Sequence, residues 1–374
     1  MRICLCVGTR PNFMKAAPLI RAFEKHGIDY KLIHTGQHYD KNMSEIFFQE
    51  LGIPEPDINL GAWVAGDSPS QQIGRTMVIF SRQIELIKPD LIMVLGDVNS
   101  TLACALVANK MGIRLAHVEA GERSNDRSMA EEINRILVDE ISDFLFCASE
   151  ESFNNLTYQR YPYKIEVNPY LVGDTMIDQL IYSEPKLGGC IVSDSMAEQY
   201  AVLTIHRAGN VDNKERLEAI IEVAFKISDQ IQIYFPCHPR VRKAMLNNNN
   251  FPTRYLDRAY QIEFIEPMSY LDFMSLVKNA AFVMTDSGGL QVETSYLDIP
   301  CLTFRENTER HDTISRGSNT LISIDNYIGG CPSSVFDCVE TIMKGRWRQS
   351  SFKSNPIHDG KASDRIVEIL KKEI

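Results

Sequence analysis

Carboxylates that could transfer protons stand close to apolar segments in the first half of the chain. Asp97 and Glu119 each close an apolar run that we interpret as a buried strand. Charged side chains are seldom placed beside a core without a partner or a chemical task, so we expect both to point into one crevice. Glu131 is a third candidate acid, although Ser128 three residues before it also matches a capping box at a helix start. The acids indicate acid–base chemistry, with helix capping as the alternative for Glu131.

A turn of small residues after the first apolar run carries two cations, Arg10 and Lys15. Taken alone, a tight strand-to-helix turn with two solvated cations is the simpler interpretation. The same residues could also bind an anionic substrate at the carboxyl end of the strand, where ligands bind in open α/β sheets.

A second candidate anion site is the segment Asp286-Ser287-Gly288-Gly289, which follows an apolar run and precedes a helical stretch. The free N–H groups and the dipole of a helix N-terminus attract phosphate, and glycine lets phosphate approach the backbone closely. One turn later, Glu293 could accept hydrogen bonds from a ribose diol.

Two histidines, His206 and His238, follow apolar runs in the second half of the chain. A single histidine is usually structural, but two at strand ends favour a functional role. Their spacing from Cys237 does not match a metal site, and the sequence contains no Walker loop, no G-x-G-x-x-G and no zinc pattern. We therefore expect neither a metal nor a nucleotide cofactor.

Alternating apolar strands and helical stretches must position these residues, and such alternation predicts parallel sheets covered on both faces. The pattern breaks near 161–174 and then restarts. The expected fold class is α/β, with two Rossmann-like doubly wound domains facing a cleft: residues 1–170, which carry the acids, and 171–359. The final helix, about 360–374, is expected to pack back on the first domain. The expected helices are 15–26, 43–51, 70–87, 101–111, 130–141, 214–228 and 362–372, besides one after Ser149 and one after Gly289. The expected strands are 3–7, 30–35, 91–95, 115–118, 144–148, 200–204, 231–235, 261–264, 282–285 and 300–304.

Composition restricts the class of protein. The 374 residues suffice for two domains, and no apolar run approaches the roughly 20 residues of a membrane span. The formal net charge of −10 argues against general affinity for nucleic acid or anionic membranes. Nine scattered cysteines and a first segment that is too short for a signal peptide predict a cytoplasmic protein.

Ten motifs in order closely resemble the non-hydrolysing UDP-N-acetylglucosamine 2-epimerases. They are GTRPNFMK, HTGQHYDKNMS, GDVNST, HVEAGERS, EEINR, VGDTMID, TIHRAGNVDN, CHPR, TDSGGLQVE and NTER. The resemblance implies a glycosyltransferase-B-like isomerase, usually a homodimer, with UDP in the interdomain cleft and a role in polysaccharide biosynthesis. It also implies inversion at C2 through 2-acetamidoglucal and free UDP, with no nicotinamide.

The resemblance also implies roles for particular residues. Asp97, Glu119 and Glu131 match the family's catalytic carboxylates, and His206 matches its active-site histidine. Gly289 belongs to the same phosphate-binding turn as its neighbour Gly288. The matched substrate and UDP contacts are Arg10, Lys15, Arg135, Ser287, Gly288, Glu293 and Arg310.

The chain departs from the family's pattern at Met129, Gly209, Val292 and His311, none of which is a proposed catalytic group. The segment 61–70 also departs from the usual Gly/Thr/His-rich loop, which leaves the sugar's substituents and a second, regulatory substrate site open. A C2 epimerase of a modified sugar, a UDP-2,3-diacetamido sugar acid or a 6-deoxy sugar, is the main alternative. A glycosyltransferase on the same frame and a non-catalytic UDP-sugar sensor are further alternatives.

Overall fold

The chain forms two compact units, each built on its own sheet. A computed structural model describes residues 1–36, 48, 50–64, 66–158, 169–188, 199–237, 239–246, 262–331 and 333–374. The first unit comprises Met1–Ser183 and Asn355–Ile374, and the second comprises Glu184–Ser354. The helix expected at 43–51 lies mostly outside the described residues, and His238 lies outside them.

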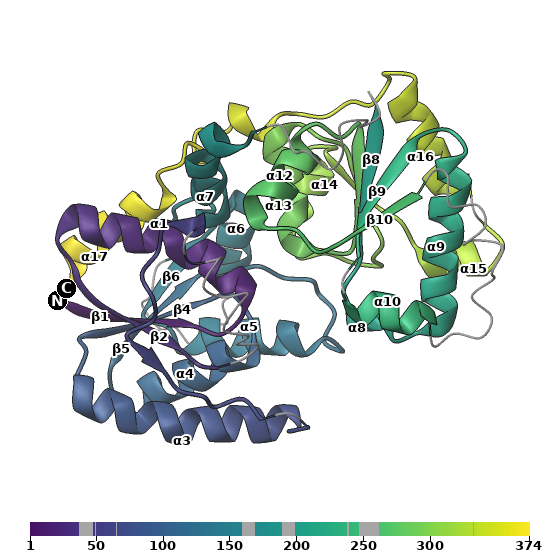
Figure 1. Ribbon diagram of the computed structural model, residues 1–374. Coiled ribbons are helices and arrows are strands. Elements are labelled where there is room, and N and C mark those ends of the chain that lie inside the picture. The colour runs from purple at the N-terminus through teal and green to yellow at the C-terminus, as the bar shows by residue number, and fades with distance from the viewer. Residues whose placement is uncertain are drawn as a thin grey trace. The chain divides into compact units, whose positions relative to one another are not determined.

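The first unit contains a seven-stranded, all-parallel sheet in the order β3-β2-β1-β4-β5-β6-β7. Its central strands are continuous apolar runs, as expected for a sheet covered on both faces. Helices α1, α7 and α17 lie on one face, and α3, α4 and α5 lie on the other (Figure 1). The strands are β1 (Arg2–Val7), β2 (Asp29–His34), β3 (Ile58–Asn59), β4 (Leu91–Leu95), β5 (Arg114–Val118), β6 (Phe144–Cys147) and β7 (Pro169–Leu171). The helices are α1 (Arg10–His26), α3 (Pro69–Ile87), α4 (Asn99–Lys110), α5 (Ala130–Ile141), α6 (Glu150–Tyr158), α7 (Thr175–Ser183) and α17 (Ala362–Glu373).

The first helix begins earlier than the sequence predicted, at Arg10 instead of Lys15. The side chain of Asn12 accepts hydrogen bonds from the backbone N–H groups of Gly8 and Thr9, at 3.1 and 3.0 Å. These bonds satisfy donors that would otherwise be unpaired at a helix start, so the small-residue turn passes directly into α1. Lys15 therefore lies one turn inside the helix.

The C-terminal helix packs on the first unit. The buried Asp178 of α7 accepts hydrogen bonds from the N–H groups of Ala362 and Ser363, at 3.1 and 2.8 Å, and so caps α17. Asp364 pairs with Lys25 near the end of α1. Because α7 packs on both α1 and α17, the first unit extends beyond residue 170, where the sequence suggested a boundary.

The second unit repeats the parallel architecture with six strands in the order β10-β9-β8-β11-β12-β13. Helices α9 and α16 pack through apolar side chains onto one large buried core. The strands are β8 (Tyr200–Thr204), β9 (Gln232–Pro236), β10 (Ile262–Ile265), β11 (Phe282–Thr285), β12 (Cys301–Thr303) and β13 (Asn319–Leu321). The helices are α8 (Ala208–Val211), α9 (Lys214–Ser228), α10 (Pro239–Leu246), α12 (Tyr270–Lys278), α13 (Gly288–Leu297), α14 (His311–Ser315), α15 (Ile324–Ile328) and α16 (Ser333–Met343).

The strand order reverses once in each sheet, between β1 and β4 in the first unit and between β8 and β11 in the second. At such a switch point the connections leave to opposite faces and open a crevice at the carboxyl ends of the strands. The prediction of two doubly wound α/β domains is confirmed, and each switch point marks where a ligand site is expected.

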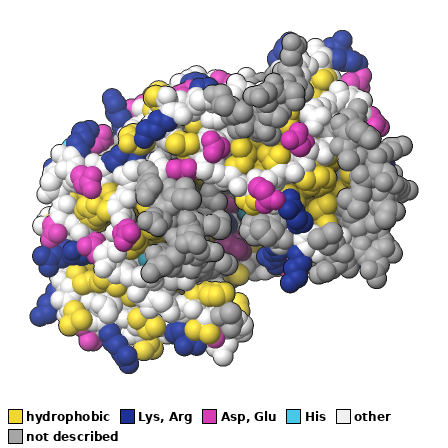
Figure 2. Space-filling view, viewed as in Figure 1, with side chains coloured by type: hydrophobic (Ala, Val, Ile, Leu, Met, Phe, Trp, Pro, Cys, Tyr) yellow, Lys and Arg dark blue, Asp and Glu magenta, His cyan; other side chains and the backbone are white. Residues whose placement is uncertain are grey.

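The surface combines side chains of both charges. Lysines, arginines and acids are scattered over both units on the face that Figure 2 shows. Among the described residues, no helix is long and apolar enough to cross a membrane.

Candidate active site

A buried ion pair joins α1 to the end of β5 in the first unit. Lys15 Nζ donates to Glu119 Oε2, and the two side chains are only 10% and 11% exposed. Glu119 has a positive φ of 75°, which costs a residue with a side chain on the order of 1 kcal/mol. Backbone strain of this kind concentrates at functional sites, so the conformation supports the choice of Glu119 from the sequence.

Gly96 leaves room for that ion pair. Its φ is 63°, and a Cβ atom there would lie 3.0 Å from Lys15 Nζ and 3.1 Å from Glu119 Oε2. Only glycine adopts this conformation and also lets the backbone approach two charged atoms so closely. The turn after β4 is therefore shaped around Lys15 and Glu119.

Asp97, the next residue, is held by α5. Arg135 donates from one guanidinium nitrogen to Asp97 Oδ2 at 2.5 Å and from another to Glu132 Oε2 at 2.8 Å. Asn134, on the same helix, donates to the backbone carbonyl of Asp97 at 2.8 Å. The Asp97 side chain remains 27% exposed, so this carboxylate is fixed in position and still open on one side.

Glu131 and its neighbour Glu132 have different environments. Glu132 is 2% exposed and accepts hydrogen bonds from the backbone N–H groups of Ser124 and Asn125. Glu131 is exposed in the first turn of α5. The capping-box interpretation is wrong, because α5 takes Met129 as its N-cap residue, without a side-chain bond, and Ser128 bonds Asp126 instead.

A fully buried histidine, which the sequence analysis did not single out, supports the turn after β4. His117 is 0% exposed; its Nδ1 lies 2.6 Å from Asp139 Oδ1, and its Nε2 lies 2.9 Å from the carbonyl oxygen of Gly96. The ring is therefore held between Asp139 and the turn after β4. Asp139 also accepts from Arg123 at 2.7 Å. Burial raises the pKa of Asp139, but His117 and Arg123 outweigh burial and hold this pKa below its usual value.

In the second unit, a buried carboxylate organises the end of β8. Asp286 is 0% exposed and accepts hydrogen bonds from the backbone N–H groups of His206 and Arg207, each at 3.0 Å, and from Asn210 Nδ2 at 3.1 Å. The His206 ring lies 3.2 Å from Asp286 and is half exposed. Partial desolvation, with the charges of Arg207 and Arg305, lowers the pKa of His206, while Asp286 opposes the shift.

The predicted phosphate-binding turn forms the N-terminus of α13. Ser287 is its N-cap residue, and its Oγ accepts from the N–H of Leu290 at 3.4 Å. A Cβ atom at Gly288 would collide with Glu309 Oε1. Glu309 pairs with the buried Arg305 at 2.7 Å. An acidic side chain of the protein thus lies where the sequence predicted an anion.

The remaining predicted contacts are distributed over the second unit. Glu293, in the second turn of α13, is 6% exposed, and its Oε1 accepts from the hydroxyl of Tyr270 at 3.1 Å. Burial and this carboxylate raise the pKa of Tyr270 well above its usual value, so the hydroxyl stays a donor. Arg310 is 4% exposed and is the N-cap residue of α14. The side chain of Arg10 lies outside the described residues.

The structure thus brings Lys15, Asp97, Glu119 and Arg135 to one sheet edge in the first unit. It brings His206, Ser287, Gly288 and Gly289 to the corresponding edge in the second unit. Three or more metal-ligating side chains do not cluster anywhere in the described part of the chain. The arrangement offers paired carboxylates for proton transfer and a helix N-terminus with arginines for phosphate.

Two parallel, doubly wound sheets of this order are typical of the glycosyltransferase-B-like class. The glycosyltransferase SnogD of Streptomyces nogalater shares the fold at a TM-score of 0.54, with 11% identity over 99% of each chain. Residues 21–371 match the family model of UDP-N-acetylglucosamine 2-epimerase. The chain belongs to this family of isomerases, as its motifs predicted.

Individual relatives match over nearly the full chain. The UDP-N-acetylglucosamine 2-epimerase of Methanocaldococcus jannaschii is 41% identical over 99% of both chains. A crystal structure of the M. jannaschii UDP-GlcNAc 2-epimerase in complex with UDP-GlcNAc and UDP has a TM-score of 0.86 and 39% identity, and covers 100% of both chains. The UDP-2,3-diacetamido-2,3-dideoxy-D-glucuronate 2-epimerase of Pseudomonas aeruginosa is 36% identical over 100% of both chains.

Proposed function

We propose that the protein interconverts UDP-N-acetylglucosamine and UDP-N-acetylmannosamine by inverting C2 of the sugar. The observation that carries the proposal is the cluster of Lys15, Asp97, Glu119 and Arg135 at one sheet edge, in a chain of this family. The similarity to a structure that contains UDP-GlcNAc and UDP supports the choice of substrate.

The chemistry requires two kinds of assistance. The proton on C2 is not activated, so a carboxylate removes it rapidly only if the C1–O bond to UDP breaks as well. The C2–H electrons then form the C1–C2 double bond of 2-acetamidoglucal, and UDP leaves with the electron pair of the C1–O bond. In the reverse direction UDP adds back to C1, and a proton is delivered to the opposite face of C2.

We assign proton transfer to the first unit. Asp97 and Glu119 are both anchored by a cation, Arg135 and Lys15 respectively, which fixes where each carboxylate oxygen lies. Such preorganisation is what makes a general acid or base effective. Glu131, exposed in the first turn of α5, is proposed as the third acid on the strength of the family resemblance.

We assign UDP binding to the second unit. The N-terminus of α13 at Ser287, Gly288 and Gly289 offers N–H groups to the diphosphate, with Arg310 as a further cation. Because Glu309 lies against Gly288, we expect the diphosphate to compete with it for Arg305. His206 would assist the departing UDP, and Glu293 would contact the ribose.

The test is to incubate the purified protein with UDP-GlcNAc in deuterated buffer and to follow C2 by NMR. The proposal expects UDP-ManNAc to form, with deuterium at C2 of both epimers. Release of UDP only when an acceptor is added, without deuterium at C2, would instead show a glycosyltransferase. Tight UDP-sugar binding without exchange would show a sensor.

A second candidate function is epimerisation of a modified sugar, favoured by the 36% identity to the P. aeruginosa enzyme. The same NMR assay with UDP-2,3-diacetamido-2,3-dideoxyglucuronate and with a 6-deoxy analogue separates the candidates. Turnover of a modified sugar without turnover of UDP-GlcNAc would replace the first proposal.

We extend the proposal to a cytoplasmic homodimer that serves polysaccharide biosynthesis, as the resemblance implies. Six of the described cysteines, Cys4, Cys6, Cys104, Cys147, Cys237 and Cys301, are free and buried, which supports a reducing compartment. Sedimentation equilibrium tests the dimer, and a single species at the 42.5 kDa of one chain would contradict it.

A further inference from the structure

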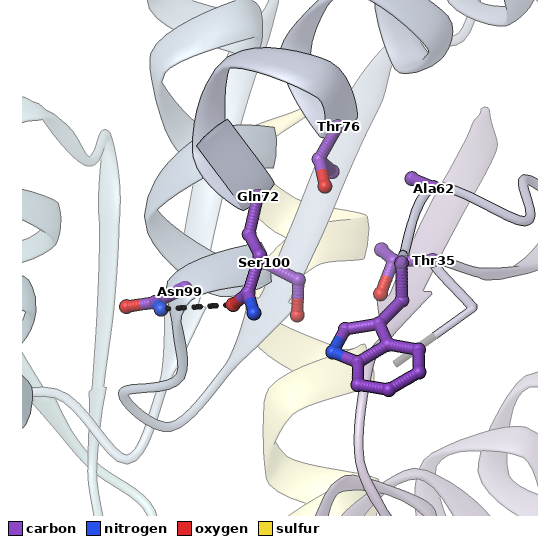
Figure 3. A pocket seen from close by; sticks show the side chains of 7 residues that line it. Thr35, Ala62, Gln72, Thr76, Asn99 and Ser100 are labelled. Carbon is purple, nitrogen blue, oxygen red and sulfur yellow. Dashed lines mark hydrogen bonds between the residues drawn. The ribbon is translucent and has the colours of Figure 1, made fainter. Parts of the chain in front are cut away.

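A small polar pocket lies beside the acid cluster in the first unit. Figure 3 shows Thr35 and Ala62 on one side of it and Gln72, Asn99 and Ser100 on the other. Thr76 and Trp63 complete the lining. Asn99 and Ser100 open helix α4, whose first N–H groups have no carbonyl partner within the helix.

One hydroxyl in this pocket lacks a partner. Thr35 is 2% exposed, and among the described residues its Oγ1 has no hydrogen-bond partner. Leaving a buried hydroxyl unsatisfied costs about 1–3 kcal/mol. Both backbone polar groups of Thr35 are hydrogen-bonded, since its N–H donates to the carbonyl of Val7 and its carbonyl accepts from the N–H of Ala62. The main chain therefore holds Thr35 in the wall of the pocket, with a hydroxyl that is unsatisfied and almost inaccessible to water.

The size and charge of the pocket restrict its ligand. About 10 Å³ is open to the centre of a water-sized group, which is room for one such group. Its seven lining residues include no acidic or basic side chain. An uncharged oxygen fits hydroxyl, amide and helix N–H donors, whereas a carboxylate would lose its hydration without gaining a cation. Trp63, 38% exposed, offers an apolar surface of the kind that packs against a sugar ring.

The pocket is connected to the acid cluster through one glycine and two amide side chains. A Cβ atom at Gly8 would collide with Ser100 and lie 3.1 Å from Thr35 Oγ1, so the turn before α1 passes close to the pocket. Asn134 donates both to Asn99 Oδ1 at 3.2 Å and to the carbonyl of Asp97 at 2.8 Å. A sugar whose C2 lies at the acids would therefore have a substituent within reach of the pocket.

We propose that this pocket binds one uncharged oxygen of the substrate sugar, from a hydroxyl or from the acetamido group, and so selects the neutral sugar. The inference rests on the proposed function, because it takes the ligand to be a UDP-sugar. It goes further in naming Thr35 and Ser100 as specificity-determining residues and Trp63 as the surface against which the ring packs.

The decisive variant is Thr35→Val, which removes the hydroxyl and keeps the shape. By calorimetry, we expect the dissociation constant for UDP-GlcNAc to rise about fivefold and that for UDP to stay unchanged. The midpoint of urea unfolding should stay the same or rise, because an unsatisfied buried hydroxyl is lost. The matched control is Thr101→Val, whose hydroxyl donates to Leu95 at 2.9 Å and whose loss should lower that midpoint.

A merely structural Thr35 would show the opposite pattern. Lower stability with unchanged UDP-GlcNAc binding, or equal weakening of UDP and UDP-GlcNAc, overturns the proposal. If Thr35→Val binds UDP-GlcNAc as the parent does while the parent epimerises it, the pocket assignment fails and the proposed function stands.

Trp63 supplies an independent readout, because the chain has two tryptophans and Trp347 packs against the core of the second unit. In a Trp347→Phe background, UDP-GlcNAc should change the Trp63 emission and UDP alone should not. UDP-glucose, which lacks the acetamido group, separates the two oxygen sources: an equal response assigns the pocket to a hydroxyl. UDP-N-acetylglucosaminuronate should bind more weakly than UDP-GlcNAc.

The fluorescence also separates the two proposals. A Trp63 response without turnover keeps the pocket and removes the epimerase proposal. No response to any sugar nucleotide, or stronger binding of the sugar acid, overturns the inference.

Discussion

The two sheet edges use carboxylates differently. In the first unit, Asp97 and Glu119 each pair with a cation and retain some exposure, at 27% and 11%. In the second unit, Asp286 is fully buried, and its hydrogen-bond partners are two backbone N–H groups and Asn210. Asp97 and Glu119 are therefore the carboxylates to which we assign proton transfer, whereas Asp286 holds the backbone at the end of β8. Substitutions should accordingly affect turnover in the first unit and binding or stability in the second.

The largest expected effect is on turnover. Asp97→Asn and Glu119→Gln should each lower kcat on the order of 100-fold or more, since each removes a carboxylate that we propose transfers a proton, while UDP binding stays near normal. Steady-state kinetics and calorimetry measure the two quantities. Near-normal turnover in both variants would remove the contrast between the edges.

Adjacent acids on α5 provide the matched control. Glu131→Gln should also lower turnover on the order of 100-fold while leaving the free energy of unfolding almost unchanged, because this side chain is exposed. Glu132→Gln should instead lower stability, since it weakens bonds to Arg135 and the 124–125 backbone. Stability loss in Glu131→Gln would argue against a chemical role.

The buried His117–Asp139 pair provides a further test of the comparison inside the first unit. Asp139→Asn should cost about 2 kcal/mol, because a neutral amide would replace the carboxylate that accepts from Arg123 and Gly121 and pairs with His117. The parent carboxyl has a lowered pKa, so its contribution is present above the ordinary value of 3.8 and is lost as the pH falls through the folded value. Below pH 4, the free energy of unfolding measured in urea should therefore fall more steeply with decreasing pH for the parent than for the variant.

Substitutions at the proposed nucleotide site in the second unit should weaken UDP binding. Gly288→Ala and Arg310→Ala should each weaken UDP binding about tenfold, one by displacing Glu309 and blocking phosphate, the other by removing a cation. Arg346→Ala, an exposed cation of the same unit, is the control and should bind UDP as the parent does. Unchanged binding in both site variants would show that UDP does not bind at α13.

The smallest expected effect concerns His206. Because its pKa is lowered in the folded state, the unfolded chain binds more protons just below the ordinary value of 6.5. Stability should therefore fall slightly as the pH drops from 7 to 5, and His206→Gln should reduce that slope. The ring is half exposed, so a large slope would contradict this environment.

The sequence determined the main elements and the family by itself. The bounds of α5 and α9 and the strands β4 and β8 agree with the prediction, because their apolar periodicity is a local property. The short strands β3, β7 and β13 were missed, since two or three residues carry no period and become strands only beside a neighbour.

Only the tertiary structure decided which acids have which partners. Glu131 and Glu132 are adjacent acids, and α5 turns one to the surface and the other to Arg135. His117 was missed because both its partners, Asp139 and the Gly96 carbonyl, lie about 20 residues away in sequence. The contact between Glu309 and Gly288 was missed for the same reason. Contacts across neighbouring strand ends depend on sheet order, which no local pattern encodes.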